Sequence, residues 1–371
     1  MRSIILLLIA LSAYLPARAD MINANLYNVT EQFDRALAEY MKEANNGNTE
    51  AYYWIGTMHY YGHGTTQDYT QAIDWFLKAA TEHGENGDPE AMALLGDINY
   101  NGFGLDKNIK NALEYYSQAA NLGHGQSGYV AGNLYAQGAE GIDANLTYSL
   151  IFWEQAADNG HTQSMHNAGY LYETGLAGPQ DHDKAYALYL KAAEKGYAPS
   201  QTKVGLYAKN YEPKRDYAVA VKYLTAAAQK QQAMAQHELG IMYFVGLGVD
   251  KDITKMIQFF EKSAANNYAR AARDLGDVFS NDDLGHKNQL RALEYYEKGG
   301  KLGDVDAQRK AASMYFNGHG TQKDVVKAAA WLIVAANTDP KANESDRDSL
   351  LATLTPGQKT RANTMASTLN F

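Results

Sequence analysis

The sequence predicts an all-α fold, a solenoid built from antiparallel helix pairs. The first observation is a unit of about 36 residues that recurs eight times along the 371-residue chain. The second is a glycine or alanine at one fixed place in every copy, followed about 16 residues later by another small residue in all but one copy. The third is an Asp or Asn four residues before that second position. A fixed period of this length indicates an array of stacked helical units.

Residues 1–19 have the pattern of a secretory signal peptide. Arg2 gives a basic start, residues 4–15 are mainly apolar, and Ala17 and Ala19 supply the small residues that precede a cleavage site. The alternative is a membrane anchor, but a span needs about 20 apolar residues. We therefore expect an exported protein, periplasmic or secreted, that does not insert into a membrane. It has no cysteine, so packing rather than disulfides must hold it together.

Residues 20–48 are expected to form an N-terminal capping helix. The segment 35–47 matches only the second half of a repeat, with Ala36 and Gly47 in register. Solenoids need such terminal elements to cover the apolar face of the first repeat.

Residues 49–340 hold the eight repeats. The small residue of the first helix, helix A, is expected to let it lie close to the second helix, helix B, with the second small residue facing it. The helix A positions are Gly56, Gly96, Gly132, Gly169, Gly205, Gly240, Gly276 and Ala312. The helix B positions are Ala72, Ala112, Ser149, Ala185, Ala220, Met256 (the exception), Ala292 and Ala328. Large aromatic residues are expected to fill the layers between repeats, among them Trp75, Tyr116, Trp153, Tyr189, Phe259 and Trp331.

The acidic residues between the two helices suggest either helix caps or calcium ligands. Every copy has Asp or Asn at this place: Asp68, Asn108, Asn145, Asp181, Asp216, Asp252, Asn288 and Asp324. That uniformity is what an N-cap requires, because the side chain accepts a backbone N–H of the first turn. The ligand spacing of an EF-hand is missing, which disfavours calcium.

Glycine pairs mark the turn between helix A and helix B, as at Gly246 and Gly248. They are expected to adopt positive φ. A phosphate-binding loop would need a preceding strand, and the pattern predicts none. Repeats five and seven lack the glycine pair. Residues 341–371 are expected to form a C-terminal capping helix that starts with Thr355 as N-cap and Pro356 at the first helical position.

The repeated unit resembles the Sel-1-like repeat, a variant of the tetratricopeptide repeat. Its pattern is L/A-G-x-x-Y-x-x-G-x-G-V-x-x-D-x-x-K-A-x-x-W-Y-x-K-A-A-x-x-G, and the best copies are residues 235–267 and 307–338. The resemblance implies a right-handed superhelix of antiparallel helix pairs that binds proteins. Exported bacterial members look like envelope adaptors, and some contact host cells. The family has no common catalytic residues.

The resemblance also places helix A along the concave groove. Its exposed face should then lie three residues before and one, four and five residues after the packing residue. The groove candidates are Tyr53, Tyr60, Tyr61, Asp97, Tyr100, Tyr129, Tyr170, Glu173, Lys209, His237, Phe244, Arg273, Arg309 and Phe316. Interfaces favour tyrosine and arginine. The alternative is that many of the 28 tyrosines only fill gaps between repeats.

Three of these candidates suggest a basic strip. Arg273 and Arg309 are one period apart and should face the same side, with Lys209 nearer the middle of the groove. An acidic segment or a chain terminus is expected to dock there, because arginine holds carboxylates through paired hydrogen bonds. The alternative is that both arginines pair with neighbouring Asp or Glu and meet no ligand.

Other classes of function are disfavoured. The chain has 33 Lys and Arg against 42 Asp and Glu, which argues against nucleic-acid binding. The ten histidines lack zinc-site spacing, so neither a metal nor a cofactor is expected. Ser200 and Lys203 form an S-x-x-K motif without the accompanying K-T-G. We therefore predict a non-enzymatic, exported scaffold that binds a protein or extended peptide. The alternatives are a peptidoglycan- or glycan-binding envelope module and, more distantly, a β-lactam-type hydrolase.

Overall fold

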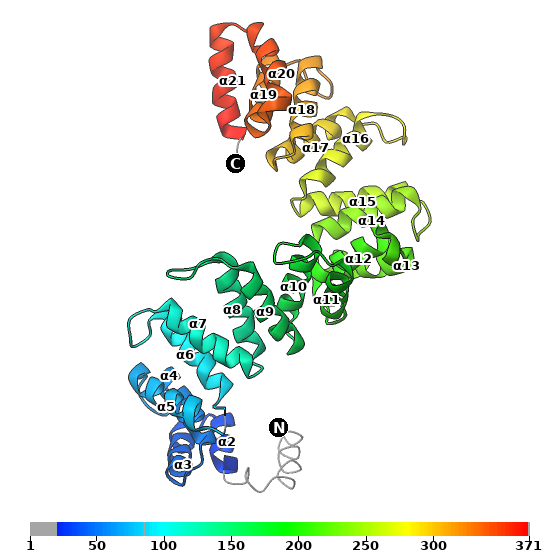
Figure 1. Cartoon of the computed structure of the whole chain (residues 1–371). Coiled ribbons are helices and arrows are strands. Elements are labelled where there is room, and N and C mark those ends of the chain that lie inside the picture. Colours follow the sequence, from blue (N-terminus) through cyan, green and yellow to red (C-terminus); the bar gives the residue numbers. More distant parts are fainter. Residues whose placement is uncertain (1–20, 85, 370–371) are drawn as a thin grey trace. The chain divides into compact units, whose positions relative to one another are not determined.

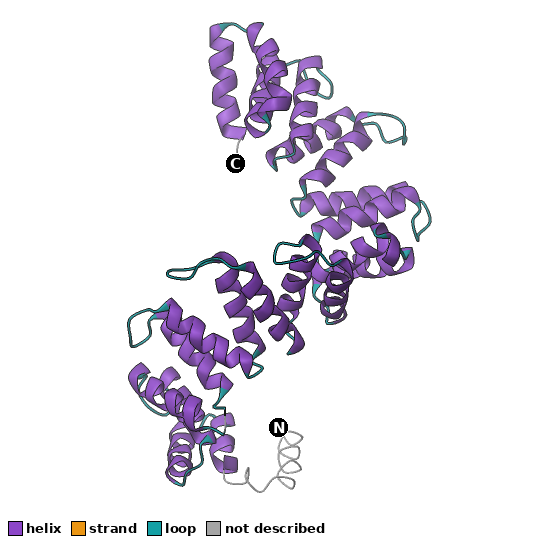
Figure 2. Cartoon of the chain, in the orientation of Figure 1, coloured by secondary structure: helices purple, strands orange, loops and turns teal. Residues whose placement is uncertain are grey.

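The computed structural model describes residues 21–84 and 86–369. This part of the chain consists of α-helices joined by short loops and contains no strand (Figures 1 and 2). The predicted all-α class and the solenoid of helix pairs are confirmed. The expected signal peptide lies outside the described residues. Within the described ranges, every helix is too short or too polar to cross a bilayer.

Each repeat contributes one helix pair. The A helices are α4 (Glu50–Tyr61), α6 (Pro89–Asn101), α8 (Gly125–Gln137), α10 (Thr162–Thr174), α12 (Ala198–Asn210), α14 (Ala233–Val245), α16 (Ala269–Ser280) and α18 (Val305–Asn317). The B helices are α5 (Tyr69–Glu82), α7 (Ile109–Asn121), α9 (Leu146–Asp158), α11 (His182–Glu194), α13 (Tyr217–Gln229), α15 (Ile253–Ala265), α17 (Gln289–Lys301) and α19 (Val325–Thr338). The chain divides into two compact units, unit 1 up to Lys191 and unit 2 from Ala192.

Both ends of the array carry a helix pair where the sequence suggested a single helix. At the N-terminal end, α2 (Ile22–Val29) packs on α3 (Phe33–Asn45), which packs on α4, and the three helices share one apolar cluster. At the C-terminal end, α20 (Pro340–Ala352) precedes α21 (Pro356–Leu369). Ala362 and Ala366 of α21 pack on Ile333 of α19 and so cover the apolar side of the last repeat. Helix α20 escaped prediction because its sequence is polar and has no small-residue position.

The packing glycines face large side chains, which corrects the expectation of small residues facing each other. A methyl group placed on any of the seven packing glycines would lie 2.4–2.9 Å from a helix B side chain four residues beyond the small residue. Gly96 thus faces the ring of Tyr116, and Gly240 faces that of Phe260. The small residue of helix B allows the backbones of helices A and B to approach closely, and the glycine of helix A leaves room for the large helix B side chain. Aromatic residues also fill the layer between repeats, as predicted: Trp331 of repeat eight lies against Gly300 of repeat seven, and Tyr116 and Trp153 cluster with apolar residues of the next repeat.

All eight Asp or Asn residues before the B helices are N-caps, as predicted. Each side chain accepts a backbone N–H of the first turn, for example Lys255 N to Asp252 Oδ1 at 2.9 Å. The Gly-x-Gly pairs of repeats one, two, six and eight are also at positive φ, with Gly246 at 87° and Gly248 at 68°. A methyl group on Gly248 would lie 2.8 Å from the carbonyl oxygen of Tyr217, so this turn packs on the start of the preceding B helix. In repeat five, a 3₁₀ turn over Glu212–Lys214 replaces the glycine pair.

A glutamine that the sequence reasoning missed ties several A helices to the preceding B helix. Nε2 of Gln201, Gln236 and Gln308 donates to the carbonyl oxygen eight residues earlier, at 2.9–3.2 Å. Asn343 of α20 makes the corresponding bond to Ala335 at 3.4 Å. Each of these carbonyls, near the end of a B helix, also accepts a backbone N–H, so the side-chain amide supplies its second hydrogen bond. Helix α20 is therefore bonded to α19 in the same way as these A helices are bonded to the preceding B helix.

Candidate interaction site

The A helices of unit 2 are linked by a chain of ion pairs. Lys209 of α12 pairs with Glu238 of α14, and His237 beside it bonds to Asp274 of α16. Arg273 of α16 reaches the carboxylates of Asp274 at 3.0 Å, Asp304 at 3.3 Å and Asp306 at 3.6 Å. Arg309 of α18 lies 3.8 Å from Asp346 of α20.

His237 is buried, which corrects its prediction as an exposed groove residue. Its side chain has no exposed surface and stacks on Phe260 at 4.9 Å between ring centroids. Nε2 is 2.7 Å from Asp274 Oδ2, whereas Nδ1 is 3.8 Å from Glu238 Oε1, beyond hydrogen-bond distance. Burial by itself lowers the pKa of His237, but the two carboxylates raise it above its usual value. The residue is therefore part of the packing between repeats.

The predicted basic strip is interleaved with carboxylates. Arg273 and Arg309 lie on the A helices of successive repeats, as expected, and Lys209 lies on α12. Both Arg273 and Lys209 are largely buried within their ion pairs, with side chains 21% and 12% exposed. Arg273 and Lys209 therefore pair with neighbouring acidic residues, which is the arrangement that the alternative interpretation of the basic strip described. Arg309 differs, because its side chain is 46% exposed and its single carboxylate contact is long. Docking of an acidic partner stays a prediction.

The groove candidates of unit 1 combine packing with exposure. The ring of Tyr53 lies 6.3 Å from that of Phe76, Tyr60 contacts Tyr69 at 5.4 Å, and Tyr129 contacts His161 at 4.6 Å, so these three fill gaps between helices. Asp97 and Glu173 accept hydrogen bonds from the hydroxyl groups of Tyr116 and Tyr189. The outward-facing members are Tyr61, Tyr100 and Tyr170, which are 57%, 39% and 45% exposed.

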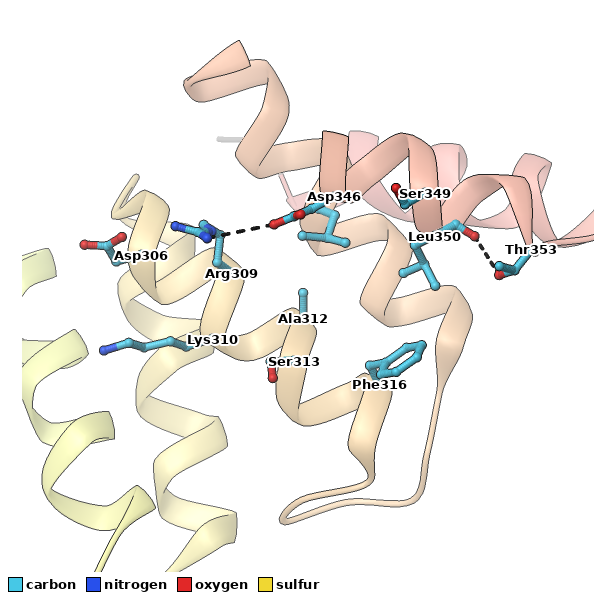
Figure 3. A pocket seen from close by; sticks show the side chains of 11 residues that line it. Asp306, Arg309, Lys310, Ala312, Ser313, Phe316, Asp346, Ser349, Leu350 and Thr353 are labelled. Atoms are coloured by element: carbon cyan, nitrogen blue, oxygen red, sulfur yellow. Dashed lines mark hydrogen bonds and ion pairs between the residues drawn. The ribbon is translucent and has the colours of Figure 1, made fainter. Parts of the chain in front are cut away.

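Two cavities open on the A-helix face of unit 2 at equivalent places in the repeat. The larger, of about 660 Å³, lies between α18 and α20 and is lined by Arg309, Phe316, Leu332 and Leu350 among others (Figure 3). The smaller, of about 340 Å³, lies between α14 and α16 and includes Phe244. Phe244 and Phe316 occupy the same repeat position, 72 residues apart, and are 39% and 42% exposed, as predicted. We call these cavity 8 and cavity 6, after their repeats.

A lysine covers the exposed ring in three repeats. Nζ of Lys107 lies 5.3 Å from the ring centroid of Tyr100, Lys251 is 5.5 Å from that of Phe244, and Lys323 is 4.8 Å from that of Phe316. The lysine directly precedes the N-cap of helix B, so the turn brings it back over the end of helix A. Among the described residues, these three ammonium groups have no carboxylate oxygen within 4.0 Å. The seven-residue spacing of ring and lysine was visible in the sequence, but its meaning depends on the path of the turn.

Ser200 lies in a packing position of α12 and is fully buried. Repeats three and four place Ser127 and Ser164 in the same position, also buried, and the other five repeats have alanine there. A buried hydroxyl in this position cannot meet a substrate. Within the described ranges, no group of three or more His, Asp or Glu side chains has the arrangement to hold a metal ion.

Comparison with known proteins finds similar solved structures and similar curated proteins. A solved Sel1 repeat protein from Oxalobacter formigenes is 23% identical and superposes with a TM-score of 0.67 over 84% of this chain and 89% of that one. The protein c5321, a protective antigen present in uropathogenic Escherichia coli strains, is 26% identical with a TM-score of 0.57 over 95% and 84%. Among curated proteins, the rat DAP3-binding cell death enhancer 1 is 30% identical over 117 residues, which are 31% of this chain and 23% of that protein.

The plant relative is more distant. The Arabidopsis thaliana protein HRD3B, an ERAD-associated E3 ubiquitin-protein ligase component, is 28% identical over 100 residues, 26% of this chain and 15% of its own length. This chain therefore matches less than a quarter of either curated relative. The family model of the Sel1 repeat matches at residues 49–83, 89–124, 129–161, 162–197, 198–231, 233–268, 269–304 and 305–337. With eight matches that follow the eight helix pairs, the chain belongs to the Sel1 repeat family.

Proposed function

We propose that this protein is a non-catalytic scaffold that binds an extended segment of another protein along the A-helix face of unit 2. The observation that carries the proposal is the pair of exposed rings, Phe244 and Phe316, at the openings of two cavities in equivalent repeat positions. Exposed aromatic side chains beside concave, partly apolar surfaces are typical of protein-binding sites. The solenoid fold of the family is consistent with such a role.

The named relatives support the same class of function. The rat relative is a DAP3-binding protein, and the plant relative is a component of a ubiquitin ligase, so both associate with other proteins. Export is a separate part of the proposal. It is supported by the signal-peptide pattern of residues 1–19 and by the Escherichia coli relative, because a protective antigen is met by its host. With export, we propose an envelope function or contact with host cells.

Site-specific photocrosslinking tests the scaffold proposal. Benzoylphenylalanine is placed at Phe316 and, as a matched control in the same unit, at Leu290 of α17, a 57% exposed helix B residue. We expect a partner to be crosslinked from position 316 in near-stoichiometric yield and not from position 290. Equal crosslinking from both positions, or none from either, contradicts the proposal.

Processing of the chain tests the export proposal. Expression of the full sequence in a bacterium, followed by fractionation and N-terminal mass analysis, should give a protein outside the cytoplasm that begins at Asp20. Full-length protein retained in the cytoplasm contradicts export and leaves the scaffold proposal standing.

A further inference from the structure

Cavity 8 combines an apolar centre with a cation at each end. Ala312, Phe316, Leu332 and Leu350 supply the apolar lining. Arg309 lies at one end, where Asp306, Lys310 and Asp346 also line the cavity. At the other end is the ring of Phe316, and Lys323, which does not itself line the cavity, covers that ring. Figure 3 shows Arg309 facing Asp346 across the cavity, with Phe316 and Leu350 further along α18 and α20.

The two end cations are more available than the other basic groups nearby. Lys310 pairs with Asp277, and Arg273 is held by three carboxylates. Lys323 is exposed and has no carboxylate partner among the described residues. Arg309 has one, Asp346, at 3.8 Å, and that residue is itself 57% exposed. A long, exposed contact of this kind contributes little and can be replaced by a better-oriented carboxylate.

The spacing of the two ends fits an extended chain. Arg309 and Phe316 are seven residues apart on α18, which is about 10 Å along the helix axis. In an extended peptide, residues two positions apart project to the same side, and the residues two before and two after a central one are about 13 Å apart. The long side chains of Arg309 and Lys323 can cover the remaining difference.

We propose that cavity 8 binds an extended peptide segment in which a large apolar residue is flanked, two positions away on either side, by acidic residues. The apolar side chain enters between Phe316 and Leu350, and the carboxylates meet Arg309 and Lys323. This inference rests on the proposed scaffold function and specifies its ligand. Cavity 6 provides the contrast. It has the same ring and lysine, Phe244 and Lys251, but its charged lining groups are Asp274, Asp277 and Asp283, so it should not accept this peptide.

A labelled heptapeptide with Phe at its fourth position and Asp at the second and sixth is the probe, and fluorescence anisotropy with the full mature protein is the measurement. Lys323→Glu and Arg309→Glu should each weaken binding about tenfold, the effect of one charge-assisted hydrogen bond. The matched substitution Lys251→Glu should leave the affinity unchanged. Asp346→Asn should strengthen binding about two- to fivefold, because it frees Arg309. All four side chains are substantially exposed, and circular dichroism verifies that the variants remain folded.

A charge-exchange experiment sharpens the test. The Arg309→Glu/Lys323→Glu variant should prefer the same peptide with Lys in place of Asp, and raised salt should weaken both matched complexes. Equal affinity of the native protein for the Asp and Lys peptides, or an equal loss from Lys251→Glu, overturns the inference. If no peptide binds while a partner is still crosslinked from position 316, the inference fails and the scaffold function stands. If both measurements are negative, both proposals fail.

Discussion

Nε2 of His237 on α14 lies 2.7 Å from Oδ2 of Asp274 on α16, so a fully buried imidazole joins the A helices of two successive repeats. The titratable groups around this pair include Glu238, Lys209, Arg273 and Tyr268, whose ring centroid lies 5.2 Å from that of His237. Burial by itself would raise the pKa of the Asp274 carboxyl, but its bonds to His237 and Arg273 hold that pKa below the usual value. The imidazole is correspondingly stabilised in its charged form.

The contribution of the His237–Asp274 pair, the joint between α14 and α16, to the free energy of unfolding should depend on pH. The pKa of His237 is raised in the folded state, so its contribution is fully present below the unfolded pKa of about 6.5 and is lost as pH rises through the folded value. The difference in free energy of unfolding between the native protein and His237→Gln should therefore shrink between pH 5.5 and pH 9. Urea unfolding at a series of pH values measures it. The same substitution at the exposed His319 is the matched control. A difference that grows with pH would contradict the assignment.

Removing a carboxylate from this joint should cost far more than removing one from the rim of cavity 8. Asp274→Ala leaves the buried His237 and the partly buried Arg273 without their shared partner, and breaking such a pair costs about 3 kcal/mol or more. Asp346→Ala breaks only the exposed contact to Arg309 and should cost less than about 1 kcal/mol. Urea unfolding at pH 7 compares the two variants. Equal losses would mean that the buried joint is no stronger than the surface pair.

The Asp and Asn residues before the B helices should act as caps without a bound ion. Asp252→Ala should lower the free energy of unfolding by about 0.5–2 kcal/mol, because Lys255 N loses its acceptor. Asp250→Ala, two residues earlier and exposed, should have almost no effect. EDTA should leave the melting temperature of the native protein unchanged. A clear drop on adding EDTA would instead indicate a bound divalent cation.

The repeat pattern was sufficient to predict the helix pairs and their caps. Asp252 shows why: an N-cap is a local interaction between a side chain and the next backbone turn, so its signal is contained in a few adjacent residues. Helix α20 shows the limit. Its polar sequence gives little apolar periodicity. It is held by Leu350 and Leu351, which pack on the apolar cluster of α19, and by the bond from Asn343 to Ala335, and a local pattern does not contain these relationships.

The candidate site was predictable only in part. The helical period correctly placed Phe244 and Phe316 on the exposed face of helix A. The same rule placed His237 there, and failed because the neighbouring A helix covers that position with Asp274. Whether a position of helix A is covered depends on the side chains of the next repeat, which differ from copy to copy. Two of the three partners of Arg273, Asp304 and Asp306, are likewise at the start of α18, beyond the reach of a single-helix argument.

The pairing of each packing glycine with a helix B side chain leads to the last prediction, which concerns coupling. Gly240→Ala places a methyl group 2.5 Å from two ring atoms of Phe260 and should destabilise the protein by about 1–3 kcal/mol, the usual cost of overpacking. Phe260→Leu alone should also destabilise it, by opening a cavity. The chain itself provides the compensated combination, since repeat eight has Ala312 and Leu332 at the two positions, both lining cavity 8.

The double variant Gly240→Ala/Phe260→Leu should therefore lose less stability than the sum of the two single variants, by about 1 kcal/mol or more, as expected for residues in contact. Urea unfolding of the four proteins in the cycle measures this coupling energy. A control cycle with Gly276→Ala and Phe260→Leu should be additive, because Gly276 faces Tyr296 in a different repeat. If the first cycle is additive as well, then the ring of Phe260 does not occupy the space that Gly240 leaves open.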